Sequence, residues 1–177
     1  DNADFNHLSV MPEEVLEWLQ PQSQGIYVDG TLGGAGHSRL ILSSTPGCRI
    51  IGLDRDEAAL AAARVVLADY AERYSLHHTT FDQAGSVLNQ LGIDAVDGML
   101  LDLGVSSNQL DTAERGFSFL RDAPLDMRMD SSRGETAADL LALTEEAELM
   151  RIFFEYGEER FSRRIARAIV KSREEEP

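Results

Sequence analysis

The sequence has 177 residues, with 31 acidic and 16 basic side chains and a formal net charge of −15. This length is typical of a domain with a sizeable core, and the acidic balance disfavours bulk, non-specific binding to nucleic acid. The single cysteine, Cys48, excludes an internal disulfide. A single cysteine is also typical of a reducing compartment. The sequence has no apolar run near the roughly 20 residues that span a bilayer, and it has no signal-peptide pattern. We therefore expect a cytoplasmic protein without a membrane span.

Apolar strands alternate with helices in the first part of the chain. The pattern predicts a short helix from Pro12, strands at 26–28, 48–53, 75–80 and 96–103, and helices at 37–44, 57–74 and 83–91. Strands that are apolar throughout are typical of a parallel sheet with both faces covered. We therefore expect an α/β fold containing the first four strands of such a sheet.

The pattern changes after Gly104. Residues 105–135 are rich in Gly, Ser, Asp and Arg, and helices are expected at 136–143, 145–156 and 158–173. Long loops in compact domains are usually functional. We expect a core domain over 1–104, followed by a loop and a helical domain over 105–177.

A glycine-rich segment follows the first expected strand and precedes a helix. Gly33, Gly34, Ala35, Gly36 and His37 belong to this loop. Glycines at such a junction let the backbone approach a ligand that the helix amides face. The segment does not fit G-x-G-x-x-G, which disfavours a dinucleotide clamp. The alternative is a glycine-rich turn without a ligand.

Two aspartates end other strands at the edge where ligands bind in open parallel sheets. Asp54 follows Gly33 by 21 residues, a spacing typical of an acid that accepts both ribose hydroxyls of NAD or S-adenosylmethionine. It could instead cap the next helix, although Asp56 is the better candidate. Asp102 is expected beside the glycine loop and could hydrogen-bond a substrate amine. Its alternative role is in an Asp-x-Gly turn.

Arginines and aromatic residues concentrate in the last third of the chain. Eleven of the sixteen basic residues lie after Glu114, and all of these except Lys171 are arginines. Arginine suits phosphate, and interleaved aromatics suit stacked bases. Core packing and salt-bridged solvated surfaces are the alternatives. The candidates for RNA binding are Arg115, Phe117, Phe119, Arg128, and a stripe at helical spacing, Arg160, Arg164, Arg167 and Lys171.

These segments together resemble the RsmH (MraW) family of S-adenosylmethionine-dependent 16S ribosomal RNA cytosine-N4 methyltransferases. The resemblance extends from about His7 to Arg173 and is most specific over residues 114–130. The other matching stretches are His7 to Val10, Tyr27 to Ser38, Gly52 to Asp56, Leu101 to Asp111, and Tyr156 to Val170.

The resemblance implies a Rossmann-like methyltransferase sheet with a helical domain inserted after strand four. It implies a small-subunit ribosomal RNA substrate. The residues themselves do not support a metal site, since no second ligand lies at helical spacing from His37. The implied cofactor contacts are the glycine loop with His37, Asp54, Phe81 against the adenine, Asp102, and Gln109. Asp102 is also the candidate catalytic residue. The run after it lacks the Pro-Pro-aromatic of many amino-methyltransferases, so their catalytic scheme is not transferred.

Members of the family continue well past the position that matches Pro177. We therefore expect a shortened chain that binds cofactor weakly and transfers little methyl. Two other interpretations stay open: a non-catalytic RNA- or ribosome-binding fragment, and a nicotinamide-dependent oxidoreductase. The target cytosine and the oligomeric state are not determined by the sequence.

Overall fold

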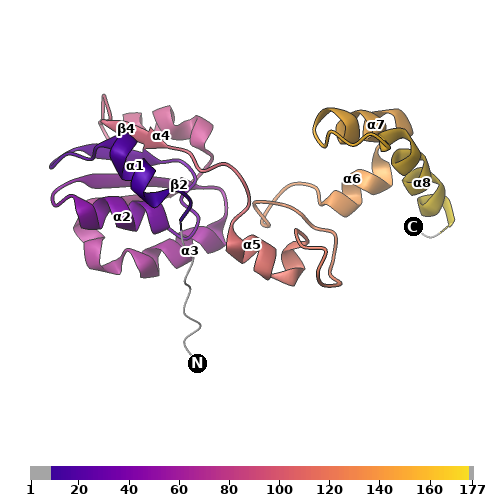
Figure 1. The fold of residues 1–177 in the computed structure, drawn as a ribbon, viewed down its shortest axis with the longest axis horizontal. Coiled ribbons are helices and arrows are strands. Elements are labelled where there is room, and N and C mark those ends of the chain that lie inside the picture. The colour runs from indigo at the N-terminus through magenta and orange to yellow at the C-terminus, as the bar shows by residue number, and fades with distance from the viewer. Residues whose placement is uncertain (1–8, 176–177) are drawn as a thin grey trace. The chain divides into compact units, whose positions relative to one another are not determined.

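A computed structural model describes residues 9–175 of the chain. The described residues include one parallel sheet with the strand order β3-β2-β1-β4 (Figure 1). The strands are β1 (Ile26–Asp29), β2 (Arg49–Asp54), β3 (Tyr74–His78) and β4 (Gly98–Leu100). The predicted parallel α/β sheet is thus confirmed, with β1 between β2 and β4.

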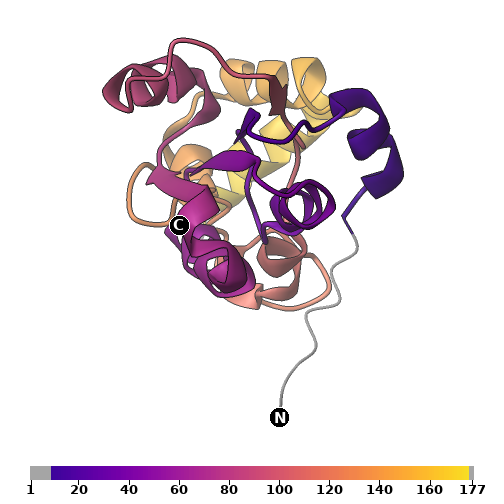
Figure 2. The ribbon, with the colours of Figure 1, turned by 90° about the vertical axis from the view of Figure 1, so that its left-hand side faces the viewer.

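Helices cover both faces of the sheet (Figures 1 and 2). They are α1 (Pro12–Leu19), α2 (Gly36–Ser44), α3 (Glu57–Val66) and α4 (Ala84–Gln90). Tyr27 and Ile50 point to the face where Ile41 of α2 and Leu60 of α3 are buried. The alternate side chains of β1 and β2 pack with Val87 of α4. Burial on both faces explains why these strands are apolar throughout.

The helix predicted over 57–74 is wrong after Val66. The α-helix ends at Val66, and a 3-10 helix over Ala68–Arg73 leads into β3. Two adjacent β-branched residues, Val65 and Val66, weaken the helix at this point. The Arg73 guanidinium donates to the carbonyls of Leu42 and Cys48, at 2.6 and 3.1 Å. These contacts hold the chain where β3 begins.

β4 is also shorter than the predicted strand over 96–103. Gly98–Leu100 pair with β1, and the chain then leaves the ladder. Among the described residues β4 has one neighbouring strand, and Met99 and Leu101 are each 42% exposed. A hydrogen bond from the Asp102 N–H to the Thr31 hydroxyl, at 2.6 Å, draws the chain toward the loop after β1.

The chain divides into two compact units, Asp1–Ser107 and Asn108–Pro177. The second unit contains most of α5 (Ser107–Asp111), a 3-10 helix (Ala113–Arg115), α6 (Ala137–Leu143), α7 (Glu146–Glu155) and α8 (Ser162–Glu175).

Helices α7 and α8 pack on each other and bury Leu149 and Ala166. Arg173 of α8 donates to the carbonyls of Leu141 and Thr144 at the end of α6, at 2.6 and 2.8 Å. Helix α8 begins four residues later than predicted, because Glu158 has a left-handed backbone conformation (φ 51°). Over residues 9–175, no helix has both the length and the apolar character needed to cross a membrane.

Candidate functional site

The candidate site lies at the carboxyl edge of the sheet in the first unit. β1 is flanked by β2 on one side and by β4 on the other, so the chain leaves β1 toward one side of the sheet and returns from β3 to the other side. Such a switch point is where open α/β sheets bind ligands. The loops that follow β1, β2 and β4 therefore form one neighbourhood.

The glycine loop has one closely packed position and one open position. A Cβ on Gly30 would lie 2.5 Å from Leu101 Cδ2 and 2.9 Å from Phe81 Cβ, so only glycine fits there. A Cβ on Gly34 would meet nothing within 4 Å. Gly33 and Ala35 have φ angles of 48° and 58°, and this left-handed turn leads into α2. The backbone is therefore accessible at Gly34.

Asp54 at the end of β2 binds the glycine loop directly. Its Oδ2 accepts the Gly33 N–H at 2.8 Å, and its Oδ1 accepts the Asp56 N–H at 2.8 Å. Asp56 in turn accepts the Ala58 N–H and caps α3, as expected. A carboxylate oxygen has two lone pairs, so each Asp54 oxygen keeps one for another donor. This arrangement is compatible with acceptance of ribose hydroxyls.

Sequence reasoning missed the role of Ser38 beneath the loop. Asp29 and Ser38 are buried, and the Ser38 hydroxyl donates to Asp29 Oδ2 at 2.7 Å. The Thr31 N–H donates to Asp29 Oδ1 at 3.3 Å. Burial raises the pKa of Asp29, partly offset by the hydrogen bond from Ser38. The pair joins β1, the loop and α2. A serine two residues after the last loop glycine is too common a feature to have revealed it.

His37 and Asp102 meet at the end of the glycine loop, where α2 begins. His37 Nε2 lies 3.7 Å from Asp102 Oδ2, and the Asp102 side chain is about half exposed. His37 is buried, and its Nδ1 has no hydrogen-bond partner among the described residues. A buried polar atom without a partner is costly, which is typical of a site that a ligand completes. The predicted proximity of Asp102 to the glycine loop is seen here.

Phe81 and Gln109 occupy different parts of the structure. Phe81 follows β3, contacts the position of Gly30 and is 42% exposed, so part of its side chain is available to a ligand. Gln109 is buried within α5 and belongs to the second unit. Its role toward a cofactor stays a prediction.

Comparison with known proteins identifies the family. The model of the MraW methylase family matches residues 4–177. The chain belongs to the MraW methylase family. Similar relatives are ribosomal RNA small subunit methyltransferases H: 57% identity in Geobacter sp. strain M21, 60% in Geobacter sulfurreducens and 53% in Heliobacterium mobile. Each alignment covers 98% of this chain and 56% of the relative, so the chain spans about half the length of these proteins.

The MraW resemblance expected from the motifs is thereby confirmed at the level of the family. The residues of the loop fit an S-adenosylmethionine-type ligand: Gly34 faces open space, and His37 Nδ1 offers an unused polar atom. Asp54 supplies acceptors beside them. Among residues 9–175, no group of three or more histidine, cysteine, aspartate or glutamate side chains is arranged to hold a metal ion.

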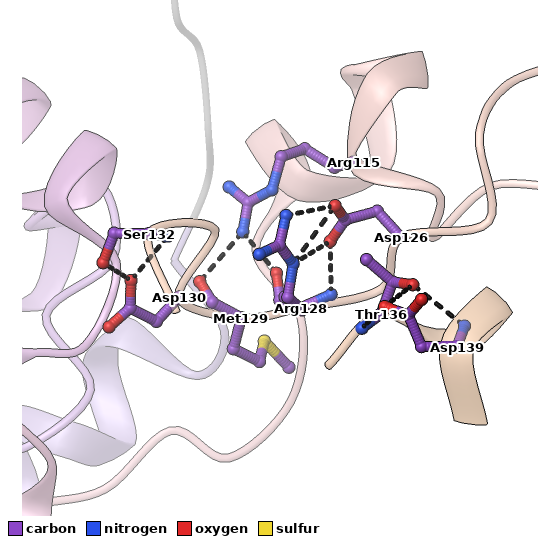
Figure 3. Close-up of polar contacts among 8 residues, drawn as sticks. All are labelled: Arg115, Asp126, Arg128, Met129, Asp130, Ser132, Thr136 and Asp139. Atoms are coloured by element: carbon purple, nitrogen blue, oxygen red, sulfur yellow. Dashed lines mark hydrogen bonds and ion pairs between the residues drawn. The ribbon is translucent and has the colours of Figure 1, made fainter. Parts of the chain in front are cut away.

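In this MraW chain the most specific sequence segment folds into a polar network in the second unit (Figure 3). The Arg115 guanidinium donates to the carbonyls of Arg128 and Met129, each at 2.9 Å. Arg128 makes a two-pronged ion pair with Asp126, the closest contact being 2.7 Å. This pair lowers the pKa of Asp126. Arg115 and Arg128 therefore order the segment, and their role toward RNA stays a prediction.

The other predicted RNA-binding residues lie in two places in the second unit. Phe117 packs under the Arg115 guanidinium, with 5.9 Å between its ring centroid and Cζ, whereas Phe119 is 96% exposed. The basic stripe lies on and just before α8, and its members Arg160, Arg164, Arg167 and Lys171 are all exposed.

Proposed function

We propose that this chain contributes the cofactor site and part of the RNA-binding region of an S-adenosylmethionine-dependent methyltransferase. The proposed reaction is methylation of the exocyclic N4 amine of a cytosine in 16S ribosomal RNA. The observation that carries the proposal is the meeting of the open glycine loop, Asp54 and the His37–Asp102 pair at one sheet edge. Membership of the MraW methylase family supports it.

The geometry of the first unit supports the proposed cofactor contacts. Backbone groups of Gly33 to Gly36 face the ligand, and Asp54 accepts the ribose hydroxyls through its remaining lone pairs. The exposed part of Phe81 stacks on the adenine. His37 Nδ1 gains the polar partner that it lacks among residues 9–175. The contact assigned to Gln109 rests on the family resemblance.

The chemistry requires alignment and a proton acceptor. S-adenosylmethionine supplies a methyl group on a sulfonium, which is already electrophilic. The N4 amine of cytosine is a poor nucleophile, because its lone pair is delocalised into the ring. We propose that the half-exposed Asp102 carboxylate accepts a hydrogen bond from this amine and then its proton. The cytosine has to leave any base stack to reach Asp102.

The proposed partner is the small ribosomal subunit or its RNA, which would place the protein in the cytoplasm. The basic residues of the second unit supply the phosphate contacts, and the acidic first unit supplies the cofactor site. This division reconciles the net charge of −15 with a nucleic-acid substrate.

The test is the position of the transferred methyl group. Small-subunit RNA is incubated with the chain and labelled S-adenosylmethionine, then digested and analysed by nucleoside mass spectrometry. The Asp102→Asn variant is the matched control, and the Geobacter sulfurreducens relative is the positive control. We expect slow transfer to cytosine N4 that Asp102→Asn abolishes.

Three results would overturn this proposal. A methyl group on another atom refutes the proposed position. No transfer above the Asp102→Asn background, while the relative is active, refutes catalysis by this chain and leaves the RNA-binding alternative. Tight binding of NADH without binding of S-adenosylhomocysteine, measured by calorimetry, indicates the oxidoreductase.

A further inference from the structure

Three large aromatic side chains are exposed where α7 and α8 are joined. Phe154, Tyr156 and Phe161 are 62%, 74% and 58% exposed. Tyr156 directly follows α7, and Phe161 directly precedes α8. Exposed aromatic rings gathered in one short segment are characteristic of interaction surfaces. They do not contribute to the buried core of the second unit, which uses Leu149 and Ala166.

Unpaired arginines accompany these rings. Residues 160–173 contain six basic side chains and no acidic one. Arg160, Arg163 and Arg164 have no ion-pair partner among residues 9–175, although acidic residues are abundant in the chain. By contrast, Arg167 lies 3.7 Å from Glu146, and Lys171 lies 4.0 Å from Glu175.

Two of these rings already pair with arginines: Phe161 with Arg164, and Tyr156 with Arg151, whose Cζ lies 5.7 Å from the ring centroid. The Arg164 Cζ lies 4.7 Å from the centroid of the Phe161 ring. In this pair the guanidinium lies over the ring of Phe161, which stays 58% exposed. Stacking of unpaired bases on aromatic rings and guanidinium planes is the common mode of single-stranded RNA recognition.

We propose that Tyr156, Phe161, Arg160, Arg163 and Arg164 form a surface that binds an unpaired RNA segment, the aromatic–arginine surface. Its arginines contact phosphates, and its rings stack on bases. An unpaired strand is favoured over a duplex because paired bases have their faces covered by their neighbours. That the partner is RNA rests on the proposed function. The new element is the assignment of the RNA contact to this surface.

The structure favours this surface over the other arginine-rich segment. Arg115 donates to the carbonyls of the segment itself, and Arg128 donates to Asp126. Moving them to phosphate would break the network that orders residues 115–139. Arg160, Arg163 and Arg164 can contact phosphate without the loss of an ion pair.

The first experiment measures RNA affinity of the 177-residue chain by fluorescence anisotropy. The probes are a labelled unpaired oligoribonucleotide and the same strand in a duplex. Phe161→Leu and Tyr156→Leu keep an apolar side chain and remove the ring. We expect each to weaken binding of the unpaired strand by about five- to 150-fold. Trp18→Leu is the matched control, since Trp18 is 84% exposed on α1 in the first unit.

Salt dependence separates the arginines from the rings. Arg163→Gln should weaken binding and reduce the slope of log affinity against log salt by about 0.7, the value for one phosphate contact on a single strand. Phe161→Leu should leave that slope unchanged. Arg64→Gln, which removes an exposed arginine of α3, is the charge control and should change neither quantity.

A direct probe of stacking uses the fact that Trp18 is the only tryptophan. Phe161→Trp combined with Trp18→Phe puts a single reporter in the proposed surface. Stacking of a base should quench its fluorescence when the unpaired strand binds, and the duplex should quench it less.

Unquenched fluorescence together with unchanged affinity in Phe161→Leu and Arg163→Gln would overturn the proposal. Preference for the duplex would overturn its commitment to an unpaired strand. Concentration-dependent self-association that Phe161→Leu removes, without an effect on RNA, would show a protein interface instead. These assays need no methyl transfer, so RNA binding here with no methylation would refute only the proposed function.

Discussion

The pair Gly30 and Gly34 provides a test that separates packing from ligand contact within one loop. Gly34→Ala places a methyl group where the structure has nothing within 4 Å. Gly30→Ala places the same methyl 2.5 Å from Leu101 Cδ2. If the space in front of Gly34 receives the cofactor, the first variant should lose binding without losing stability. The second should lose stability.

The magnitudes follow from the contacts. Overpacking at Gly30 should lower the free energy of unfolding by about 1–3 kcal/mol. At Gly34 the backbone has no positive φ, so alanine should raise that free energy by about 0.4–1 kcal/mol through the unfolded state. A methyl that displaces a ligand from the backbone costs roughly 1–3 kcal/mol of binding, or about five- to 150-fold in Kd.

Two assays measure these effects. Urea denaturation gives the free energy of unfolding, and calorimetry with S-adenosylhomocysteine gives Kd. Gly85→Ala is the matched control, because its Cβ also meets nothing within 4 Å but lies in α4. Wild-type affinity in Gly34→Ala would refute the assignment of the open space to the cofactor. Wild-type stability in Gly30→Ala would refute the packing argument.

Three further predictions concern charged groups. Burial raises the pKa of Asp29, so its contribution to stability is complete below the ordinary pKa of 3.8 and is lost as pH rises through the raised value. Asp29→Asn keeps an acceptor for the Ser38 hydroxyl and should remove this fall in the free energy of unfolding, measured by urea denaturation from pH 4 upward. An unchanged pH profile would contradict the burial effect. Asp54→Ala removes the acceptor of two N–H groups and should cost about 1–3 kcal/mol of unfolding free energy, with at least tenfold weaker binding of S-adenosylhomocysteine; unchanged calorimetry would exclude the ribose role. Arg128 lowers the pKa of Asp126, so this ion pair stabilises the second unit above the ordinary aspartate pKa and is lost as pH falls through the depressed value. Asp126→Asn should reduce this loss of stability at acid pH, followed by circular dichroism. An equally steep loss would show that other carboxylates dominate the acid unfolding of the second unit.

Much of the first unit could be predicted from local patterns. Apolar runs such as Ile50 to Leu53 and the glycine-rich junction after Asp29 indicate buried strands and a ligand loop within a few residues of sequence. The path of the chain from α3 to the start of β3 could not be predicted in this way. It depends on the contact of Arg73 with carbonyls of Leu42 and Cys48, more than 20 residues away.

The candidate site shows the same distinction. Asp54 and Asp102 could be selected because parallel strands end at one edge, whichever side chains surround them. The Ser38–Asp29 hydrogen bond and the unpartnered Nδ1 of His37 could not, because burial and hydrogen bonding depend on every element packed nearby.

The sequence by itself determined the order of strands and helices, the position of the glycine loop and the resemblance to the MraW methylase family. These properties depend on residue type and spacing along the chain. Only the tertiary structure decided which arginines are available to a partner: Arg128 is paired with Asp126, whereas Arg163 and Arg164 have no acidic partner among the described residues. The physical reason is that an ion pair depends on the distance between two charged groups in space, which the folded chain sets.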